Sequence, residues 1–346
     1  MKQLENRICF LDCLRILACL AVIVNHTTPL VFQARDPGGL TWFASITVFF
    51  ASKFAVPVFY MITGYLLLGK IDPWPKAWVR IRRMVLVILG TGTVYWLVRG
   101  LLLEPDTQPG QILENLLSIY RVTPSNALWY LYNYLGMLLM MPFFQKLSAG
   151  MTRQDFHIYF GISALFFGIL PILGHYYPNA VTNPHFGIPI FSGHICMLFL
   201  GQYFARFPLK PSKRGLSTAC GIFLGMLAFN VTATWLEAGR NPEAYLFFDN
   251  RTYFPILAQS VCVFYAASCL DVGEGMTTVI RSLAAHTFPI YLLADLAMEA
   301  LSPLYPWLTG IVHPLPAVAC YTMLIFLVCL LIAIPLKWIP GLKRLL

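Results

Sequence analysis

Charged residues are scarce in this chain, and their scarcity excludes an ordinary soluble domain. Only 11% of its 346 residues are Asp, Glu, Lys or Arg, whereas soluble domains carry about 25%. The chain is 58% hydrophobic and its mean hydropathy is +0.68. Its 24 prolines and 24 glycines are tolerated by membrane helices, which re-satisfy freed backbone groups on neighbouring helices. The composition therefore predicts an all-α integral membrane protein.

Acidic residues are scarcer than basic ones, but the imbalance does not indicate nucleic-acid binding. The chain has 15 Asp and Glu against 24 Lys and Arg, a net charge of +9. The basic residues lie at the ends of hydrophobic stretches, where charge decides membrane orientation. No basic stripe with interleaved aromatics marks a soluble domain, so we expect no nucleic-acid partner.

Metal-binding and nucleotide-binding motifs are also missing from the sequence. Its nine cysteines form no CxxC pair and no Cys/His metal spacing, so we interpret them as small apolar packing residues and expect no metal. No glycine-rich nucleotide loop is present. No small-residue cleavage site follows the first apolar run, which we expect to be a retained span. We expect one membrane-embedded domain over residues 1–346, without an appended soluble domain.

Ten hydrophobic stretches are long enough to cross the roughly 30 Å hydrocarbon core, which takes about 20 helical residues. They cover residues 9–32, 42–68, 82–103, 127–145, 156–174, 187–206, 216–236, 252–270, 282–303 and 315–337. The sequence thus predicts about ten transmembrane helices. Charged residues within them predict a central cavity, because an ionisable side chain facing lipid is costly.

Lysine and arginine are distributed unevenly between the two sides of these stretches. With a cytoplasmic N-terminus, the inside segments hold 17 of the 24 cations and the outside segments hold 5. Arg15 and Lys53 lie within the stretches themselves. Since cytoplasmic loops are enriched in Lys and Arg, we expect both termini to be cytoplasmic.

The first stretch carries Arg15 and, eleven positions later, His26. Eleven helical steps return to within roughly 20° of the start, so both side chains share one face, about 16 Å apart along the axis. A cation and an imidazole at two depths of one helix indicate a functional pathway. The alternative is that Arg15 snorkels to the inner surface and His26 ends the helix at the outer surface.

A basic segment follows the second stretch. It contains Lys76, Arg80, Arg82 and Arg83, and Arg80 and Arg83 share a helical face. Two guanidinium groups on one face suit phosphate oxygens. Anchoring to anionic membrane lipids is the alternative explanation for such a segment.

Two further stretches combine helix-breaking or aromatic residues with a possible site. Pro57 removes a helical hydrogen bond and Gly64 permits close backbone approach, which predicts a broken helix beside a cavity or a simple packing kink. Trp129, Tyr130 and Asn133 open the fourth stretch. These aromatics suit an interfacial belt or a surface that stacks on a sugar ring.

The ninth stretch places two carboxylates on one helical face, Asp295 and Glu299. That stretch runs outward, so Glu299 reaches about the depth of His26. A carboxylate hydrogen-bonded to one imidazole nitrogen would orient the ring and raise its basicity. We therefore predict Asp295 and Glu299 as catalytic partners of His26.

In combination, these motifs resemble membrane acyltransferase family 3, which includes the O-acetyltransferases of bacterial surface glycans. The resemblance covers nearly the whole chain. It rests on five segments: Asp12, Arg15 and His26; the pair Arg80 and Arg83; residues 56–67; residues 128–131; and residues 282–293. Thr63 stands where the family usually has Ser. Ala294 stands where it often has His, so this chain lacks that group or uses Asp295 instead.

The resemblance implies a multi-pass enzyme of the bacterial cytoplasmic (inner) membrane that transfers an acyl group, most often acetyl. The donor would be cytoplasmic acyl-CoA (acetyl-CoA), bound through Arg15, Lys76, Arg80, Arg82 and Arg83. The acceptor would be a hydroxyl of an envelope polysaccharide or of its lipid-linked precursor, held at Trp129, Tyr130 and Asn133. His26 would act as general base or become acylated itself. A non-catalytic transporter or exporter of a small polar solute or glycan is the competing hypothesis, because it too would bury Arg and His.

Overall fold

The computed structural model describes residues 2–104, 108–180, 188–241, 245–270 and 273–345, and these residues form helices joined by loops, with no strand among them. The α-helices are α1 Lys2–Thr27, α2 Pro29–Phe32, α3 Leu40–Ser52, α4 Ala55–Leu67, α5 Trp74–Val98, α6 Pro109–Leu117, α7 Trp129–Gly150, α8 Arg153–Ser163, α9 Leu170–Tyr176, α10 Gly193–Arg206, α11 Lys213–Arg240, α12 Phe254–Ser268, α13 Glu274–Ala284, α14 Thr287–Ala300, α15 Leu304–Thr309, α16 Pro314–Leu336 and α17 Pro340–Leu345. The all-α prediction is confirmed.

Seven helical segments in the described part of the chain are long and apolar enough to cross a membrane. They are Cys9–Phe32, Leu40–Leu67, Trp74–Leu103, Asn126–Gly150, Arg153–Tyr176, Lys213–Arg240 and Pro314–Leu336. Each of them corresponds to one of the ten stretches predicted from the sequence. The protein therefore contains several membrane-spanning helices, as its composition predicts.

The other three predicted stretches correspond to shorter helices. α10 and α14 have 14 residues each and α12 has 15, which is roughly 21–23 Å of helix. Residue 187, where one predicted stretch begins, lies outside the described residues. The stretch 282–303 divides between α13 and α14, because Pro289 has no N–H to donate to the carbonyl of Ala285. That carbonyl accepts a hydrogen bond from Lys337 Nζ instead.

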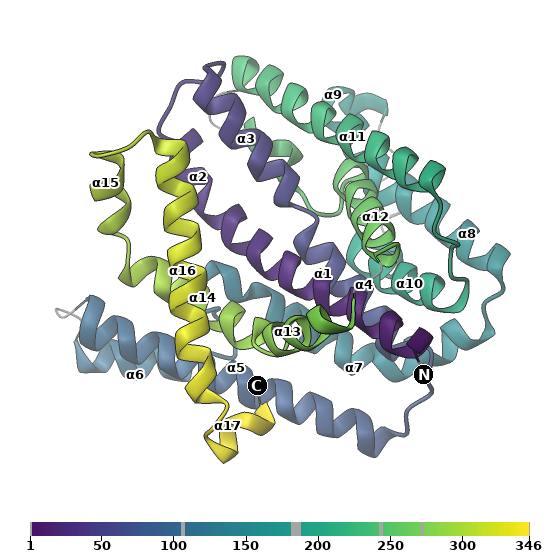
Figure 1. The fold of residues 1–346 in the computed structure, drawn as a ribbon, viewed down its shortest axis with the longest axis horizontal. Coiled ribbons are helices and arrows are strands. Elements are labelled where there is room, and N and C mark those ends of the chain that lie inside the picture. The colour runs from purple at the N-terminus through teal and green to yellow at the C-terminus, as the bar shows by residue number, and fades with distance from the viewer. Residues whose placement is uncertain (1, 105–107, 181–187, 242–244, 271–272, 346) are drawn as a thin grey trace.

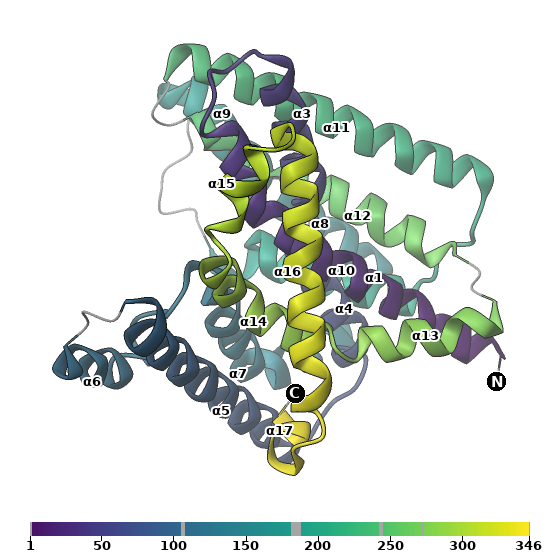
Figure 2. The same cartoon turned by 60° about the vertical axis from the view of Figure 1, so that its left-hand side comes forward.

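Helix α1 crosses the middle of the bundle and contacts α3, α4, α12, α13, α14 and α16. Figures 1 and 2 show α5 on one side of α1 and the long helix α11 on the other. In the 18-residue apolar stretch of each segment, 72% of the residues of Leu40–Leu67 are buried within the protein, against 17% of those of Lys213–Arg240. The helices α3 and α4 beside α1 are thus interior, and α11 presents most of its apolar surface outward.

The span predicted over residues 42–68 is broken, and the break lies at Lys53 and Phe54, between α3 and α4. Pro57 explains this position, because its ring nitrogen cannot donate to the Lys53 carbonyl four residues earlier. The break places a lysine, only 4% exposed, at an interior position beside a cavity. The structure thus interrupts the regular helix in this stretch, for which the sequence left open a broken helix beside a cavity or a packing kink, and Lys53 lines the cavity.

Gly64 of α4 and Gly201 of α10 form a reciprocal close contact. A Cβ atom at Gly64 would overlap the carbonyl of Leu198, and one at Gly201 would overlap the carbonyl of Met61. Each glycine thus lets the facing backbone approach, as small residues do in membrane helix pairs. The α4–α10 pair is therefore closely packed on the side of α4 that carries Gly64.

Gly64→Ala is expected to lower the free energy of unfolding by about 1–3 kcal/mol, because the facing atoms are rigid backbone and cannot move aside. Thermal unfolding in detergent measures the change. Gly90→Ala in α5 is the matched control, since a Cβ there meets nothing within 4 Å. Equal unfolding temperatures for the two variants would contradict the close packing of α4 on α10.

Candidate functional site

One cavity of about 440 Å³ joins the motif residues of α1, α4, α5 and α7. Its ionisable and aromatic lining includes Arg15, His26, Lys53, Arg80, Arg83, Trp129, Tyr130, Tyr134, Arg251 and Tyr291. Arg15 and His26 lie on the single helix α1, about 16 Å apart along its axis. We call the end of the cavity near Arg15, Arg80 and Arg83 the basic end, and the end near His26 the histidine end.

The three arginines of the basic end come from two helices, and each has a defined contact. Arg15 Nη1 lies 2.7 Å from Asp12 Oδ1, one turn earlier on α1. Arg80 Nη1 lies 2.5 Å from Asp72 Oδ2. Arg83 Nε donates to the backbone carbonyl of Leu345 at 3.0 Å. Arg83 alone has no carboxylate contact among the described residues, so it is the arginine most available to an anionic ligand.

Asp72 organises the loop that leads into α5. Its buried carboxylate accepts from Arg80, from Lys76 Nζ at 2.7 Å and from Gln145 Nε2 at 3.1 Å. The Gln145 side chain also accepts from the backbone N–H of Asp72 and donates to Leu67, so α7 holds both sides of the loop. Burial alone raises the pKa of Asp72, but the hydrogen bonds from Lys76, Arg80 and Gln145 outweigh it and hold the pKa well below its usual range.

Asp72→Asn is expected to lower the free energy of unfolding by about 1–3 kcal/mol at pH 7, since hydrogen bonds to a charged acceptor are lost. Because the folded-state pKa lies below the unfolded value of about 3.9, the ionised carboxylate stabilises the protein above about pH 4 and loses this effect as the pH falls through the folded-state pKa. Unfolding temperatures of wild type and variant should therefore differ by the same amount from pH 8 to pH 5. A difference that shrinks across that range would contradict this assignment.

The histidine end of the cavity holds two further cations. Lys53 forms an ion pair with Asp249 and lies 3.9 Å from the ring centroid of Phe49. The guanidinium of Arg251 lies over the ring of Trp129, 4.9 Å from its centroid. Asn25, next to His26 on α1, donates to Ser52 Oγ at 3.0 Å. The cavity is therefore cationic at both ends.

The wall between the two ends is aromatic and apolar. Tyr130 packs against Tyr134 with ring centroids 5.8 Å apart, and against Phe59 and Tyr291. Tyr291 donates to the backbone carbonyl of Ala127 at 2.7 Å, which fixes the start of α7. Trp129 and Tyr130 therefore face the cavity from a supported position.

Comparison with known protein families decides the class of the molecule. The model of an acyltransferase domain matches residues 9–334, nearly the whole chain. The chain belongs to this acyltransferase family. Searches of curated proteins and of solved structures found no match. The resemblance to membrane acyltransferase family 3 is confirmed, and with its apolar helices the protein is a multi-pass membrane acyltransferase.

Three residues predicted to contact substrates lie outside the cavity of the acyltransferase. Lys76 is bound to Asp72 and Arg82 is exposed on α5. Asn133 accepts a hydrogen bond from Tyr60 at 2.8 Å, so it stabilises the packing of α7 on α4. None of the three is among the residues that line the cavity.

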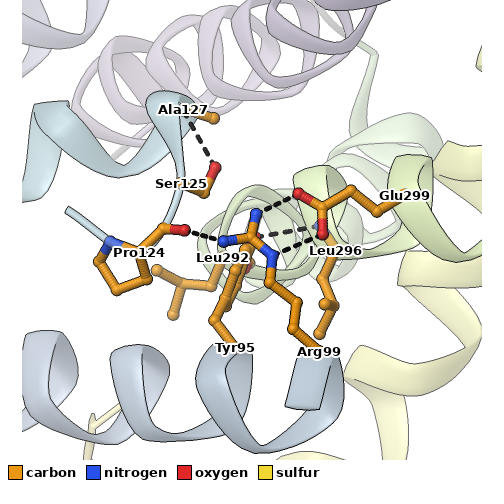
Figure 3. A network of polar contacts seen from close by, with 8 residues as sticks. All are labelled: Tyr95, Arg99, Pro124, Ser125, Ala127, Leu292, Leu296 and Glu299. Carbon is orange, nitrogen blue, oxygen red and sulfur yellow. Dashed lines mark hydrogen bonds and ion pairs between the residues drawn. The ribbon is translucent and has the colours of Figure 1, made fainter. Parts of the chain in front are cut away.

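The predicted contact of Asp295 and Glu299 with His26 is corrected by the structure. Glu299 accepts from Arg99 Nε at 2.7 Å, and the same guanidinium donates to the carbonyl of Pro124 (Figure 3). Neither Asp295 nor Glu299 lines the cavity, and no described contact joins either of them to His26. The Arg99–Glu299 pair instead ties the end of α5 to α14 and to the loop before Trp129.

Two charged residues of the site, Lys53 and Arg251, were not predicted from the sequence as site residues. Lys53 carried a usable signal, because a lysine within an apolar stretch is costly unless it is functional or paired. Arg251 follows Asp249 and Asn250 in a loop and carried no signal beyond its charge. Its place in the acyltransferase cavity depends on a contact with Trp129, more than a hundred residues away.

Proposed function

We propose that this acyltransferase moves an acyl group, acetyl in the first instance, from cytoplasmic acyl-CoA to a hydroxyl of an envelope polysaccharide or of its lipid-linked precursor. The observation that carries the proposal is the single cavity with Arg15, Arg80 and Arg83 at one end and His26 at the other. A donor with anionic groups at one end and a reactive thioester at the other matches this arrangement of arginines and histidine.

The basic end suits the phosphates of coenzyme A. Guanidinium groups bind phosphate oxygens through paired, charge-assisted hydrogen bonds. The cavity volume of about 440 Å³ lies within the range of ligand sites, about 300–1,000 Å³. We infer that the nucleotide stays at the mouth while the pantetheine arm extends past Val56 and Phe59 toward His26. This arm is comparable in length to the rise of about 16 Å between Arg15 and His26.

At the histidine end, the imidazole of His26 accepts the proton of the acceptor hydroxyl. The hydroxyl oxygen forms a bond to the thioester carbonyl carbon, the carbon–sulfur bond breaks, and the thiolate leaves with the proton that His26 returns. In the second route an imidazole nitrogen attacks the thioester carbonyl carbon, the carbon–sulfur bond breaks, and CoA leaves as the thiol with the proton of the other ring nitrogen. The hydroxyl oxygen then attacks the acyl-imidazole, the carbon–nitrogen bond breaks, and the hydroxyl proton restores the neutral imidazole. Only the second route leaves label on the protein, and denaturation at neutral pH is used to detect it because acyl-imidazoles hydrolyse rapidly in acid.

We also propose that the basic end faces the cytoplasm and that α10, α12 and α14 complete a ten-helix topology. The 17-to-5 distribution of Lys and Arg supports this orientation. The starts of α1 and α13 meet through Cys9 and Thr277, and the end of α17 meets α5 through Leu345 and Arg83. These contacts support placing both termini near the basic end.

Consumption of radiolabelled acetyl-CoA by purified protein in liposomes tests the proposed function. We expect thioester cleavage, with label in water, glycan or protein, because the cavity brings the thioester to a histidine. A transporter that uses the same cavity would leave the thioester intact. Absence of both acetyl-CoA binding and cleavage, repeated with succinyl-CoA, would overturn the proposal and favour transport.

A further inference from the structure

The histidine end of the cavity carries more positive charge than the described residues neutralise. Lys53 and Arg251 both line it together with His26, and the hydrogen bond from Asn25 to Ser52 joins the chain neighbours of His26 and Lys53. Asp249 is the one carboxylate of the described residues that pairs with either cation, and it pairs with Lys53. One cation is therefore left in excess beside His26.

That cation is Arg251. It has no hydrogen bond or ion pair to any described residue, and its described contact is with the face of Trp129. A guanidinium over an aromatic ring keeps its N–H groups available at its edge. A largely buried charge without a partner is costly, so its position in a cavity indicates an anionic ligand that supplies the missing partner.

We infer that Arg251, supported by Lys53, forms a subsite for a negatively charged group of the acyl acceptor, a phosphate or a carboxylate. The inference rests on the proposed function for the identity of the ligand as an acceptor. Because Arg251 and His26 line the same end of the cavity, the anionic group binds beside the hydroxyl that is acylated. Each end of the cavity thus binds its own anionic ligand, the donor at Arg83 and the acceptor at Arg251.

This subsite restricts the acceptor. A neutral sugar leaves Arg251 unpaired, whereas an acidic sugar or a sugar linked to a lipid carrier through phosphate pairs with it. Trp129, which lies against Arg251, gives the sugar ring a flat apolar surface at the same place. Acceptor preference is thereby set by charge as well as by the sugar.

Binding of three small probes to the full-length protein in nanodiscs tests the inference: methyl glucoside, methyl glucuronide and glucose 1-phosphate. Calorimetry in the presence of saturating CoA, which competes for the basic end, gives each affinity. We expect wild type to bind at least one anionic probe about 10-fold or more tightly than the neutral one, and Arg251→Gln to weaken that binding by about 10- to 100-fold. Arg121→Gln, an exposed arginine outside the cavity, is the charge-matched control and should bind as wild type does.

Arg251→Lys should retain part of the preference, since it keeps the charge but loses the paired N–H groups. If Arg251→Gln weakens the binding of glucose 1-phosphate alone, the acceptor is linked through phosphate. If it weakens the binding of the glucuronide alone, the acceptor is an acidic sugar. Equal affinity of wild type for neutral and anionic probes overturns the inference, whether or not the variants fold. Because no step of this test requires acyl transfer, failure of the proposed function would appear separately, in the acetyl-CoA assay.

Discussion

His26→Ala is expected to lower the rate of acyl transfer by about 100- to 10,000-fold, the usual contribution of a general base. The loss should appear in kcat, with little change in the affinity for acetyl-CoA, because the site proposed for the donor phosphates is at the other end of the cavity. Among the residues that the structure describes, His26 is the one histidine that lines the cavity. Initial rates with radiolabelled acetyl-CoA in liposomes give kcat, and equilibrium binding of CoA gives the affinity.

The control is His157→Ala, which removes a histidine of α8 that bonds the Tyr203 hydroxyl at 2.9 Å outside the cavity. This variant should keep the wild-type rate. If His26→Ala also kept the wild-type rate while folded, His26 would not take part in the reaction by either route. Label trapped on wild-type protein and absent from His26→Ala would select the acyl-imidazole route.

Arg83→Gln is expected to lower kcat/KM for acetyl-CoA by about 10- to 100-fold, because a charge-assisted contact to phosphate contributes about 1.5–3 kcal/mol. The effect should disappear with acetyl-pantetheine, a donor without phosphates. Since Arg83 contacts only a backbone carbonyl within the described chain, its replacement leaves no buried carboxylate unpaired. The ratio of kcat/KM for the two donors is the measured quantity.

Arg82→Gln is the matched control for this experiment. It removes the same charge from the neighbouring position of α5, where the side chain is exposed and does not line the cavity. The ratio of kcat/KM for acetyl-CoA to kcat/KM for acetyl-pantetheine is compared in the two variants. If Arg83→Gln leaves this ratio unchanged, or if Arg82→Gln changes it equally, a phosphate site at the basic end is contradicted. The second result would instead indicate that the segment acts through its overall charge.

The parts of the site that lie on one helix could be predicted from the sequence. The spacing of Arg15 and His26 fixes their common face, because helical periodicity is local. The spacing of Arg80 and Arg83 does the same for α5, and both pairs line the cavity. The break near Pro57 was also predictable, since the missing N–H is a property of the residue itself.

The parts that depend on contacts between helices could not be predicted in the same way. The spacing of Asp295 and Glu299 gives their common face but not the rotation of α14 against α1. Arg99, at the far end of α5, competes for Glu299 and binds it. Hydropathy also does not indicate where a helix begins. The stretches predicted from it are therefore longer than the helices α10, α12 and α14 that the structure contains. Lys53 and Arg251 line the cavity of His26 from two segments between helices, which no local pattern encodes.

Sided acyl transfer tests the central claim most directly. The protein is reconstituted in vesicles, its orientation is measured by protease access to a C-terminal tag, and labelled acetyl-CoA is supplied only on the side of the basic end. We predict that label is transferred to acceptor glycan enclosed on the opposite side, and that His26→Ala abolishes this transfer in vesicles of equal protein content. Label confined to the side of the donor in active wild-type vesicles would contradict transfer through the cavity.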